Sequence, residues 1–259
     1  MKNNYKKELE VAKLSAKIAG DFLIKEYDKK RKVNFKKKHE IVTDADKKAD
    51  LLITKTIKNT FPHHNILSEE TLHKKTNDKY LWVVDPLDGT NNYAHKIPLF
   101  AVCIALAENK NIKVGVVYLP YFKEMFWAVK NNGAYLNNKK IITSKTMDIK
   151  NSFVVKCHGY DKKEQALDHK IFAGVDKASG STRRIGCAGY ELAKTAEGQL
   201  DGGYIIGTRP WDSAAGALIV KEAKGEVTNF KGEDWDLFDK NILFTNKILH
   251  KKLLKIINK

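Results

Sequence analysis

Two aspartates, Asp85 and Asp88, follow a short apolar stretch in the first half of this 259-residue chain. The stretch, residues 80–84, is aromatic and β-branched, which predicts a strand buried on both faces, and Pro86 predicts that this strand ends before it. Two carboxylates then stand at the end of a buried strand. Because ionised carboxylates are costly to bury, the pair favours cations between them, and acidic oxygens with a backbone carbonyl suit Mg²⁺.

The residues after these aspartates, Gly89 and Thr90, have the character of a phosphate-binding turn. Glycine lets the backbone approach a ligand closely, and a short helix opening here would offer free N–H groups to an anion. Asp-Pro and Asp-Gly are also common turn dipeptides, so a turn without chemistry is the alternative at this motif.

Two further acidic sites favour the interpretation of this motif as a metal- and phosphate-binding site over its interpretation as a plain turn. Glu69 and Glu70 end another short apolar run, and Asp212 precedes an apolar stretch that predicts a helix. For Asp212 taken alone, a helix N-cap is the simpler interpretation.

Together these motifs resemble the inositol monophosphatase family of Mg²⁺-dependent phosphomonoesterases. The resemblance rests on Asp-Pro-Leu-Asp-Gly-Thr at 85–90, on Glu69-Glu70 upstream, and on Trp-Asp-Ser-Ala-Ala-Gly at 211–216, over about residues 42–230. It implies a mixed α/β (α+β) fold, the layered α-β-α-β-α sandwich of the inositol monophosphatase and fructose-1,6-bisphosphatase type. We expect one domain, residues 1–259, with a sub-lobe at 1–147 that carries metal-binding motifs and another at 148–259 that carries the substrate pocket and the last metal ligand.

The resemblance also implies a two-metal site that holds two Mg²⁺ ions, with a third, looser ion near Glu69 and Glu70. The implied metal ligands are Glu69, Asp85, the carbonyl of Leu87, Asp88 and Asp212. The implied catalytic residues are Thr90, Asp46, Glu69 and Asp88. Asp46 would pair with Thr90 to orient the attacking water, which is chemically sensible because a threonine hydroxyl is a poor base without a carboxylate to accept its proton. A family lysine near the metal site corresponds to one of Lys36 to Lys38, and the spacing does not choose among them.

The implied substrate-binding residues are Gly89, Thr90, Asp88, Gly186, Cys187, Ala188, Ile205, Arg184 and Asp212. Two of them depart from the family pattern: Ile205 stands where inositol-specific members carry a glutamate, and Cys187 where threonine or serine is usual. We expect inositol monophosphate as the substrate. Arg183, Arg184 and Arg209 could bind a second phosphate, so fructose 1,6-bisphosphate, NADP, phosphoadenosine phosphate and histidinol phosphate stay open as alternatives.

The formal net charge of +16 raises a second functional class, a protein that binds RNA or a transcription complex. The chain has only four arginines and its lysines are dispersed, which does not favour a nucleic-acid partner. No stretch approaches the ~20 apolar residues of a membrane span, no signal sequence is evident, and three widely spaced cysteines indicate reduced thiols. We therefore expect a cytoplasmic protein with no membrane partner, and by resemblance a homodimer.

Hydrophobic periodicity and turn residues predict elements along the whole chain. Helices are predicted over 6–27, from Thr43 to Pro62, over 165–172, 189–197 and 213–223, and at the C-terminus. Strands are predicted over 33–35, 80–84, 99–106, 112–118, 124–129, 153–156, 204–206, 226–228 and 241–244. Those from 99 to 129 should form an antiparallel meander.

Overall fold

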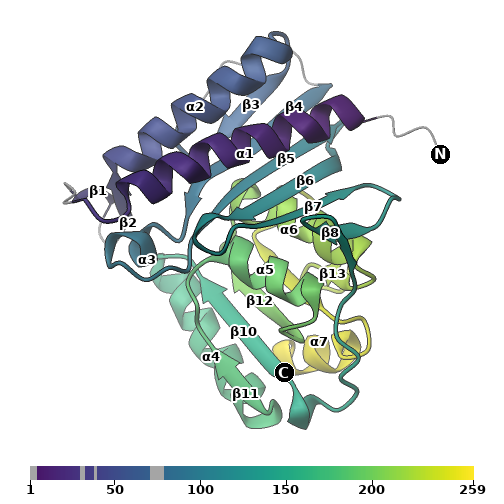
Figure 1. Ribbon diagram of the computed structural model, residues 1–259. Helices are drawn as coiled ribbons and strands as arrows, with labels where there is room; N and C mark the ends of the chain where they lie inside the picture. The colour runs from purple at the N-terminus through teal and green to yellow at the C-terminus, as the bar shows by residue number, and fades with distance from the viewer. Residues whose placement is uncertain (1–4, 30–32, 38–39, 71–78) are drawn as a thin grey trace.

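The computed structural model describes residues 5–29, 33–37, 40–70 and 79–259, and within them helices and sheets alternate in an α-β-α-β-α stack (Figure 1). One outer layer contains α1 (Lys6–Glu26) and α2 (Asp44–Thr60). The central layer contains α5 (Ala188–Glu197) and α6 (Pro210–Glu222), and the other outer layer contains α4 (Lys162–Ala178) and α7 (His250–Ile257). The predicted layered sandwich is confirmed.

The larger sheet has seven strands, hydrogen-bonded in the order of the sequence. They are β3 (Asn65–Ser68), β4 (Tyr80–Asp88), β5 (Ala101–Glu108), β6 (Asn111–Leu119), β7 (Glu124–Val129), β8 (Ala134–Leu136) and β9 (Lys139–Ile141). Only β3 and β4 are parallel, and the remaining pairs are antiparallel. The predicted meander is therefore confirmed, and β7 has the predicted bounds.

The smaller sheet has five strands in the order β11 (Ser181–Arg183), β10 (Phe153–His158), β12 (Gly202–Ile206), β14 (Asn241–Thr245) and β13 (Glu226–Thr228). The first three strands are parallel and the last two join antiparallel. A separate hairpin pairs β1 (Val33–Lys37) with β2 (Glu40–Thr43). The proposed sub-lobe boundary at residue 147 falls between the two sheets in sequence.

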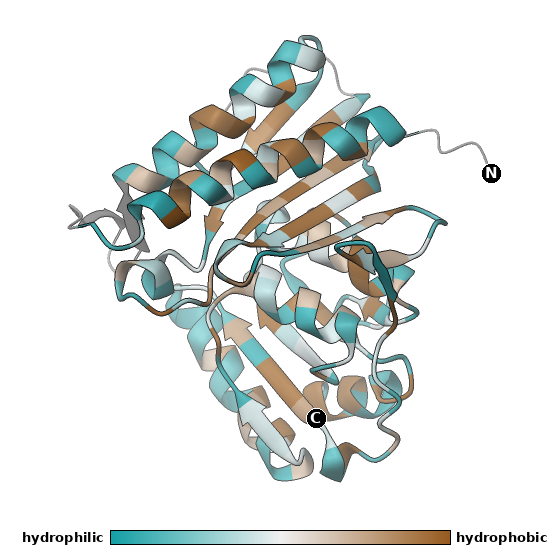
Figure 2. Cartoon of the chain, viewed as in Figure 1, coloured by the Kyte–Doolittle hydropathy of each residue, from teal (hydrophilic) through white to brown (hydrophobic). Residues whose placement is uncertain are grey.

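Strands β4 and β5 are buried on both faces because helices cover each side of the larger sheet. Val83 and Cys103 pack with the central helices, whereas Trp82, Val84 and Ile104 pack with α1 and α2. This explains why the apolar run does not alternate with polar residues. The brown strands between helical layers in Figure 2 show the same distribution.

The prediction that the strand ends before Pro86 is wrong. β4 continues to Asp88, and its pairing moves from Asp85 opposite Cys103 to Asp88 opposite Ala101, so β4 has one extra residue there. This is a β-bulge, and a bulge accommodates proline because it interrupts the regular ladder of hydrogen bonds.

Helix α4 is longer than predicted. It begins at Lys162 because Asp161 and Glu164 form a capping box. Helix α6 begins at Pro210, which places Asp212 in its first turn. The short strands β2, β3, β8, β9 and β11 were not predicted. Within the described ranges, no helix combines the length and apolar character that a bilayer crossing needs.

Candidate active site

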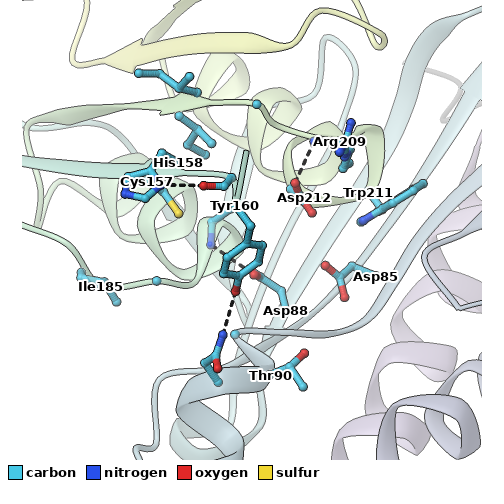
Figure 3. A pocket seen from close by; sticks show the side chains of 18 of the residues that line it. Asp85, Asp88, Thr90, Cys157, His158, Tyr160, Ile185, Arg209, Trp211 and Asp212 are labelled. Carbon is cyan, nitrogen blue, oxygen red and sulfur yellow. Dashed lines mark hydrogen bonds between the residues drawn. The ribbon is translucent and has the colours of Figure 1, made fainter. Parts of the chain in front are cut away.

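A pocket of about 720 Å³ opens where loops and element ends from both sheets meet (Figure 3). It is lined from one side by the end of β4 and by α3 (Thr90–Ala94), and from the other by the ends of β10 and β12 and the starts of α4 and α6. It brings together most of the predicted site residues: Glu69, Asp85, Leu87, Asp88, Gly89, Thr90, Arg184, Gly186, Ala188, Ile205 and Asp212. Asp46 and Cys187 are buried behind this lining.

Acidic side chains from β4, from α6 and from the segment after β3 repel one another in this pocket. Asp85 is 2% exposed, and its pKa is raised well above the usual value, first by burial and then by the charges of Glu69, Asp88 and Asp212. The pKa of Asp212 is also raised, by burial and then by Glu69. Asp85, Asp88 and Asp212 face a common space in Figure 3.

This donor set fits hard divalent cations. Carboxylate oxygens are the ligands that Mg²⁺ prefers, and a cation among them would relieve the repulsion that raises their pKa values. Among the described residues, no three acidic, histidine or cysteine side chains are already gathered as a metal-binding group. The match between these carboxylates and a divalent cation therefore rests on the chemistry of the oxygen donors and on the coupling of their charges.

The first turn of α5 holds the carboxylate of Asp88. The backbone N–H groups of Gly189 and Ala188 donate to its two oxygens at 2.5 and 3.3 Å, and the Cys187 thiol donates at 3.1 Å. Burial raises the pKa of Asp88, and these hydrogen bonds oppose the rise. A negative charge is also favoured at a helix N-terminus. Cys187 thus contacts Asp88 from behind, and its own side chain is fully buried.

Thr90 begins α3 beside a glycine in the left-handed region. Gly89 has φ +84°, and a Cβ there would lie 2.9 Å from the backbone oxygen of Leu99. The Thr90 hydroxyl lies 3.1 Å from Asp46 Oδ1 and 2.9 Å from the Leu87 carbonyl oxygen. The structure therefore brings together Thr90 and Asp46, which are 44 residues apart in sequence.

The loop before α5 depends on Glu191, a residue that the sequence analysis did not single out. Its Oε1 accepts the N–H groups of Ile185 and Gly186 at 3.2 and 3.3 Å. Burial, and then the charge of Asp88, raise its pKa well above the usual value. The available signal was an acid in the first turn of the predicted helix 189–197, immediately after the pocket loop.

The other side of the pocket contains further residues that were not predicted, among them His158, Tyr160, Asp161 and Glu164. Asn91 Nδ2 donates to the Tyr160 hydroxyl at 2.7 Å, which joins α3 to the loop after β10 across the pocket. These residues come from the segment 157–164, where sequence patterns gave no catalytic motif. Only the folded chain places them opposite β4.

The predicted arginines divide between pocket and surface. Arg184 and Arg209 line the pocket, whereas Arg183 is exposed and lies over the ring of Phe153, 5.5 Å from its centroid. The expectation for Lys36 to Lys38 concerns side chains outside those that the structure describes.

Comparisons with known proteins identify similar chains over nearly the full length. The model of the inositol monophosphatase family matches residues 4–259. A protein of Aquifex aeolicus named fructose-1,6-bisphosphatase/inositol-1-monophosphatase is 37% identical, over 99% of this chain and 97% of its own. The Nus factor SuhB of Escherichia coli is 35% identical, over 95% and 94%. The crystal structure of the extragenic suppressor protein suhB from Bartonella henselae superposes with a TM-score of 0.94 at 31% identity, over 98% of this chain and 99% of that one.

Proposed function

The chain belongs to the inositol monophosphatase family, and from that premise we propose that it hydrolyses inositol monophosphate with Mg²⁺ as its cofactor. Members of the family are phosphomonoesterases and are generally metal-dependent. One observation carries the proposal: Glu69, Asp85, Asp88 and Asp212 couple electrostatically in a single pocket that also contains Thr90. This combination suits a metal-dependent attack of water on a phosphate ester.

The proposed metal ligands are Glu69, Asp85, the carbonyl of Leu87, Asp88 and Asp212. Bound Mg²⁺ ions, two in number and a looser third near Glu70, would supply charge neutralisation and an acidified water. The contribution of the chain is to hold the carboxylates. The N–H group of Leu87 donates to Asp85 at 3.0 Å, and the N–H group of Arg209 donates to Asp212 at 2.7 Å.

The proposed catalytic residues are Thr90 and Asp46, together with Glu69 and Asp88 on the metal side. The Thr90 hydroxyl lies 3.1 Å from Asp46 Oδ1, and a hydrogen bond donated to this carboxylate would leave the lone pairs of the Thr90 oxygen free to orient the attacking water. The backbone of Gly89 and Thr90 would hold the phosphate, and Gly186 and Ala188 would contact the leaving group. Holding water and phosphate in line is worth several orders of magnitude in rate.

Phosphate release tests this function most directly. The wild-type protein is assayed on inositol 1-phosphate, fructose 1,6-bisphosphate, NADP, 3'-phosphoadenosine 5'-phosphate and histidinol phosphate, with Mg²⁺ and with EDTA. We expect Mg²⁺-dependent release, with the highest kcat/KM for inositol 1-phosphate. Equal phosphate release in EDTA would refute the requirement for Mg²⁺. A higher kcat/KM for another ester would make that ester the substrate in place of inositol 1-phosphate.

Fructose 1,6-bisphosphate is the strongest alternative substrate. The name of the Aquifex aeolicus relative includes this activity. Arg184 and Arg209 line the pocket and could pair with a second phosphate.

A second candidate function is participation in a transcription complex, because the similar Escherichia coli protein is a Nus factor. The net charge of +16 is compatible with an RNA partner. Filter binding of RNA over a range of salt concentrations tests it. We also propose a homodimer in the cytoplasm, which light scattering and cell fractionation would test.

A further inference from the structure

The pocket wall formed by the ends of β10 and β12 is poor in hydrogen-bond acceptors. Ile205 and Ile206 pair with Cys157 and His158 along these strands, and all four line the pocket. A polyol that leaves from a phosphate ester presents several hydroxyl groups. A site that buries such hydroxyls without acceptors loses affinity and selectivity for them.

An acidic side chain from α4 reaches the same wall. Glu164 lines the pocket, and its carboxyl group lies against Gly207, which follows Ile206 directly at the end of β12. A Cβ atom on Gly207 would lie 2.3 Å from Glu164 Cδ and Oε1. The carboxylate therefore occupies space that a side chain at 207 would fill, two residues beyond Ile205.

A second glycine makes room for the other oxygen of this carboxylate. A Cβ atom on Gly159 would lie 2.1 Å from Glu164 Oε2. Gly159 follows β10, and its N–H group donates to the Ile206 carbonyl at 2.9 Å, so the two strand ends are joined beneath the carboxylate. Two glycines from neighbouring strand ends thus form a seat for Glu164.

One oxygen of Glu164 is engaged by the helix cap, and the other, Oε1, is the carboxylate oxygen nearer to Gly207. Oε2 accepts the N–H group of Asp161 at 3.2 Å, as part of the capping box of α4. Within the described residues, no hydrogen-bond donor is assigned to Oε1. A carboxylate accepts up to about four hydrogen bonds, so Glu164 has acceptor capacity for hydroxyl groups.

Glu164 is also distinct from the acidic group at the metal side. The charges that chiefly raise the pKa of Asp85 come from Glu69, Asp88 and Asp212. Glu164 belongs to a different element and sits at the wall that the leaving group would contact.

We propose that Glu164 is a specificity-determining residue that accepts hydrogen bonds from the hydroxyl groups of a neutral polyol leaving group. This inference rests on the proposed function, because it concerns the ester that the same pocket hydrolyses. The negative charge at this wall repels a second phosphate placed there, so it favours a polyol monophosphate over a bisphosphate.

The variant Glu164→Gln tests the proposal. Glutamine serves at this position of a capping box as glutamate does, so α4 keeps its start while the carboxylate is lost. The wild type and the variant are compared on inositol 1-phosphate and on p-nitrophenyl phosphate, whose leaving group has no polyol hydroxyls. We expect kcat/KM for inositol 1-phosphate to fall about tenfold to a hundredfold, mainly through KM, as for the loss of a charged hydrogen bond. The value for p-nitrophenyl phosphate should stay unchanged or rise.

Two additional variants sharpen this test. Asp176→Asn removes the same charge from the exposed part of α4, away from the pocket. It should leave kcat/KM unchanged for both substrates. Gly159→Ala keeps the carboxylate but displaces it from its seat, so it should reproduce the selective loss on inositol 1-phosphate.

The outcomes separate the inference from the function on which it rests. A wild-type protein that hydrolyses neither ester would refute the proposed function, and this inference with it. Suppose instead that the wild type hydrolyses both esters. If Glu164→Gln then lowers kcat/KM for both esters equally, or for neither, the role of Glu164 is overturned and the proposed function stands. An Asp176→Asn variant with the same selective loss would also overturn it, because remote charge would then explain the effect.

Discussion

At the residue scale, the Thr90 hydroxyl connects the segment after β4 to the first turn of α2. It is within hydrogen-bond distance of Asp46 Oδ1 and of the Leu87 carbonyl, the first a proposed proton acceptor and the second a proposed metal ligand. This position allows one hydroxyl to orient a water molecule without itself binding the cation. Its removal should therefore separate turnover from metal binding.

We predict that Thr90→Ala lowers kcat by about 10²- to 10⁴-fold, the usual contribution of a positioned proton-transfer group. Mg²⁺ affinity, measured by calorimetry, should change little because the carboxylate ligands remain. Thr90→Ser keeps the hydroxyl and serves as the control, with activity near that of the wild type. A Thr90→Ala protein with normal kcat would remove this residue from the mechanism.

The buried charge of Asp85 leads to a prediction about stability and pH. Its folded-state pKa is raised, so its contribution to stability is present below the unfolded value of about 3.9 and is lost as pH rises through the folded value. At neutral pH without metal, burial of this carboxyl group therefore opposes folding. Asp85→Asn should raise the metal-free stability by roughly 1–3 kcal/mol, which corresponds to a few degrees in Tm.

Thermal melts in EDTA and in Mg²⁺ between pH 5 and pH 8 measure this effect. For the wild type, the increase in Tm caused by Mg²⁺ should grow with pH, because protons compete with the cation for the carboxylates. For Asp85→Asn the increase should largely disappear. A Mg²⁺ effect that is the same in both proteins would show that Asp85 is not a metal ligand.

At the scale of elements, the close approach of α6 to the larger sheet sets the position of Asp212. A Cβ atom on Gly115 of β6 would lie 2.6 Å from the Ala215 backbone oxygen of α6. On the opposite face, a Cβ atom on Gly20 of α1 would lie 2.5 Å from the ring of Tyr118. Only the first contact involves the helix that carries a proposed metal ligand.

We predict that Gly115→Ala destabilises the protein by roughly 1–3 kcal/mol, the usual cost of overpacking, and also weakens Mg²⁺ binding because α6 must shift. Gly20→Ala is the matched control, which should lower Tm but leave Mg²⁺ affinity unchanged. Thermal melts and calorimetry on both variants measure the contrast. Equal Mg²⁺ affinities in the two variants would show that the α6 contact does not position Asp212.

Elements with a strong local pattern could be predicted from sequence, and those fixed by tertiary contacts could not. α1 ends one residue before its predicted end, and β7 and β13 have the predicted bounds, because apolar periodicity and turn residues mark them locally. The continuation of β4 through Pro86 depends on its pairing with β5, which no local pattern reveals. The early start of α4 had a local signal, the capping pair Asp161 and Glu164, which the apolar pattern alone did not use.

The same distinction holds for the site. The aspartates of β4 and α6 belong to compact motifs and could be named from the sequence, as could Thr90. Glu191 and Glu164 belong to no such motif, because the contacts that place them, with the N–H groups of residues 185–186 and beside Gly207, are made only in the folded chain. Cys187, one of the expected substrate-binding residues, has a fully buried side chain whose thiol donates to Asp88 at 3.1 Å, a contact that only the folded chain reveals.

At the scale of the whole molecule, an acidic pocket is set within a strongly basic chain. The net charge is +16, whereas the pocket contains Glu69, Asp85, Asp88 and Asp212. Cations bound in this pocket would neutralise these carboxylates locally, and the surrounding positive charge would attract an anionic phosphate ester over a longer range. The surface lysines could therefore serve to attract the substrate, a role that requires no nucleic-acid partner and that can be tested.

We predict that kcat/KM for the phosphate ester falls severalfold between about 20 and 300 mM KCl, while kcat at saturating substrate changes little. Salt shortens the Debye length from about 20 Å to less than 10 Å over this range, which screens attraction between surface lysines and the ester but not contacts inside the pocket. Steady-state phosphate release at fixed free Mg²⁺ measures both quantities, and potassium chloride is preferred because it adds no divalent ion. A kcat that falls in parallel with kcat/KM would indicate salt acting inside the pocket instead. A kcat/KM independent of salt would leave the positive charge without a role in capturing substrate and would strengthen the case for a separate polyanionic partner.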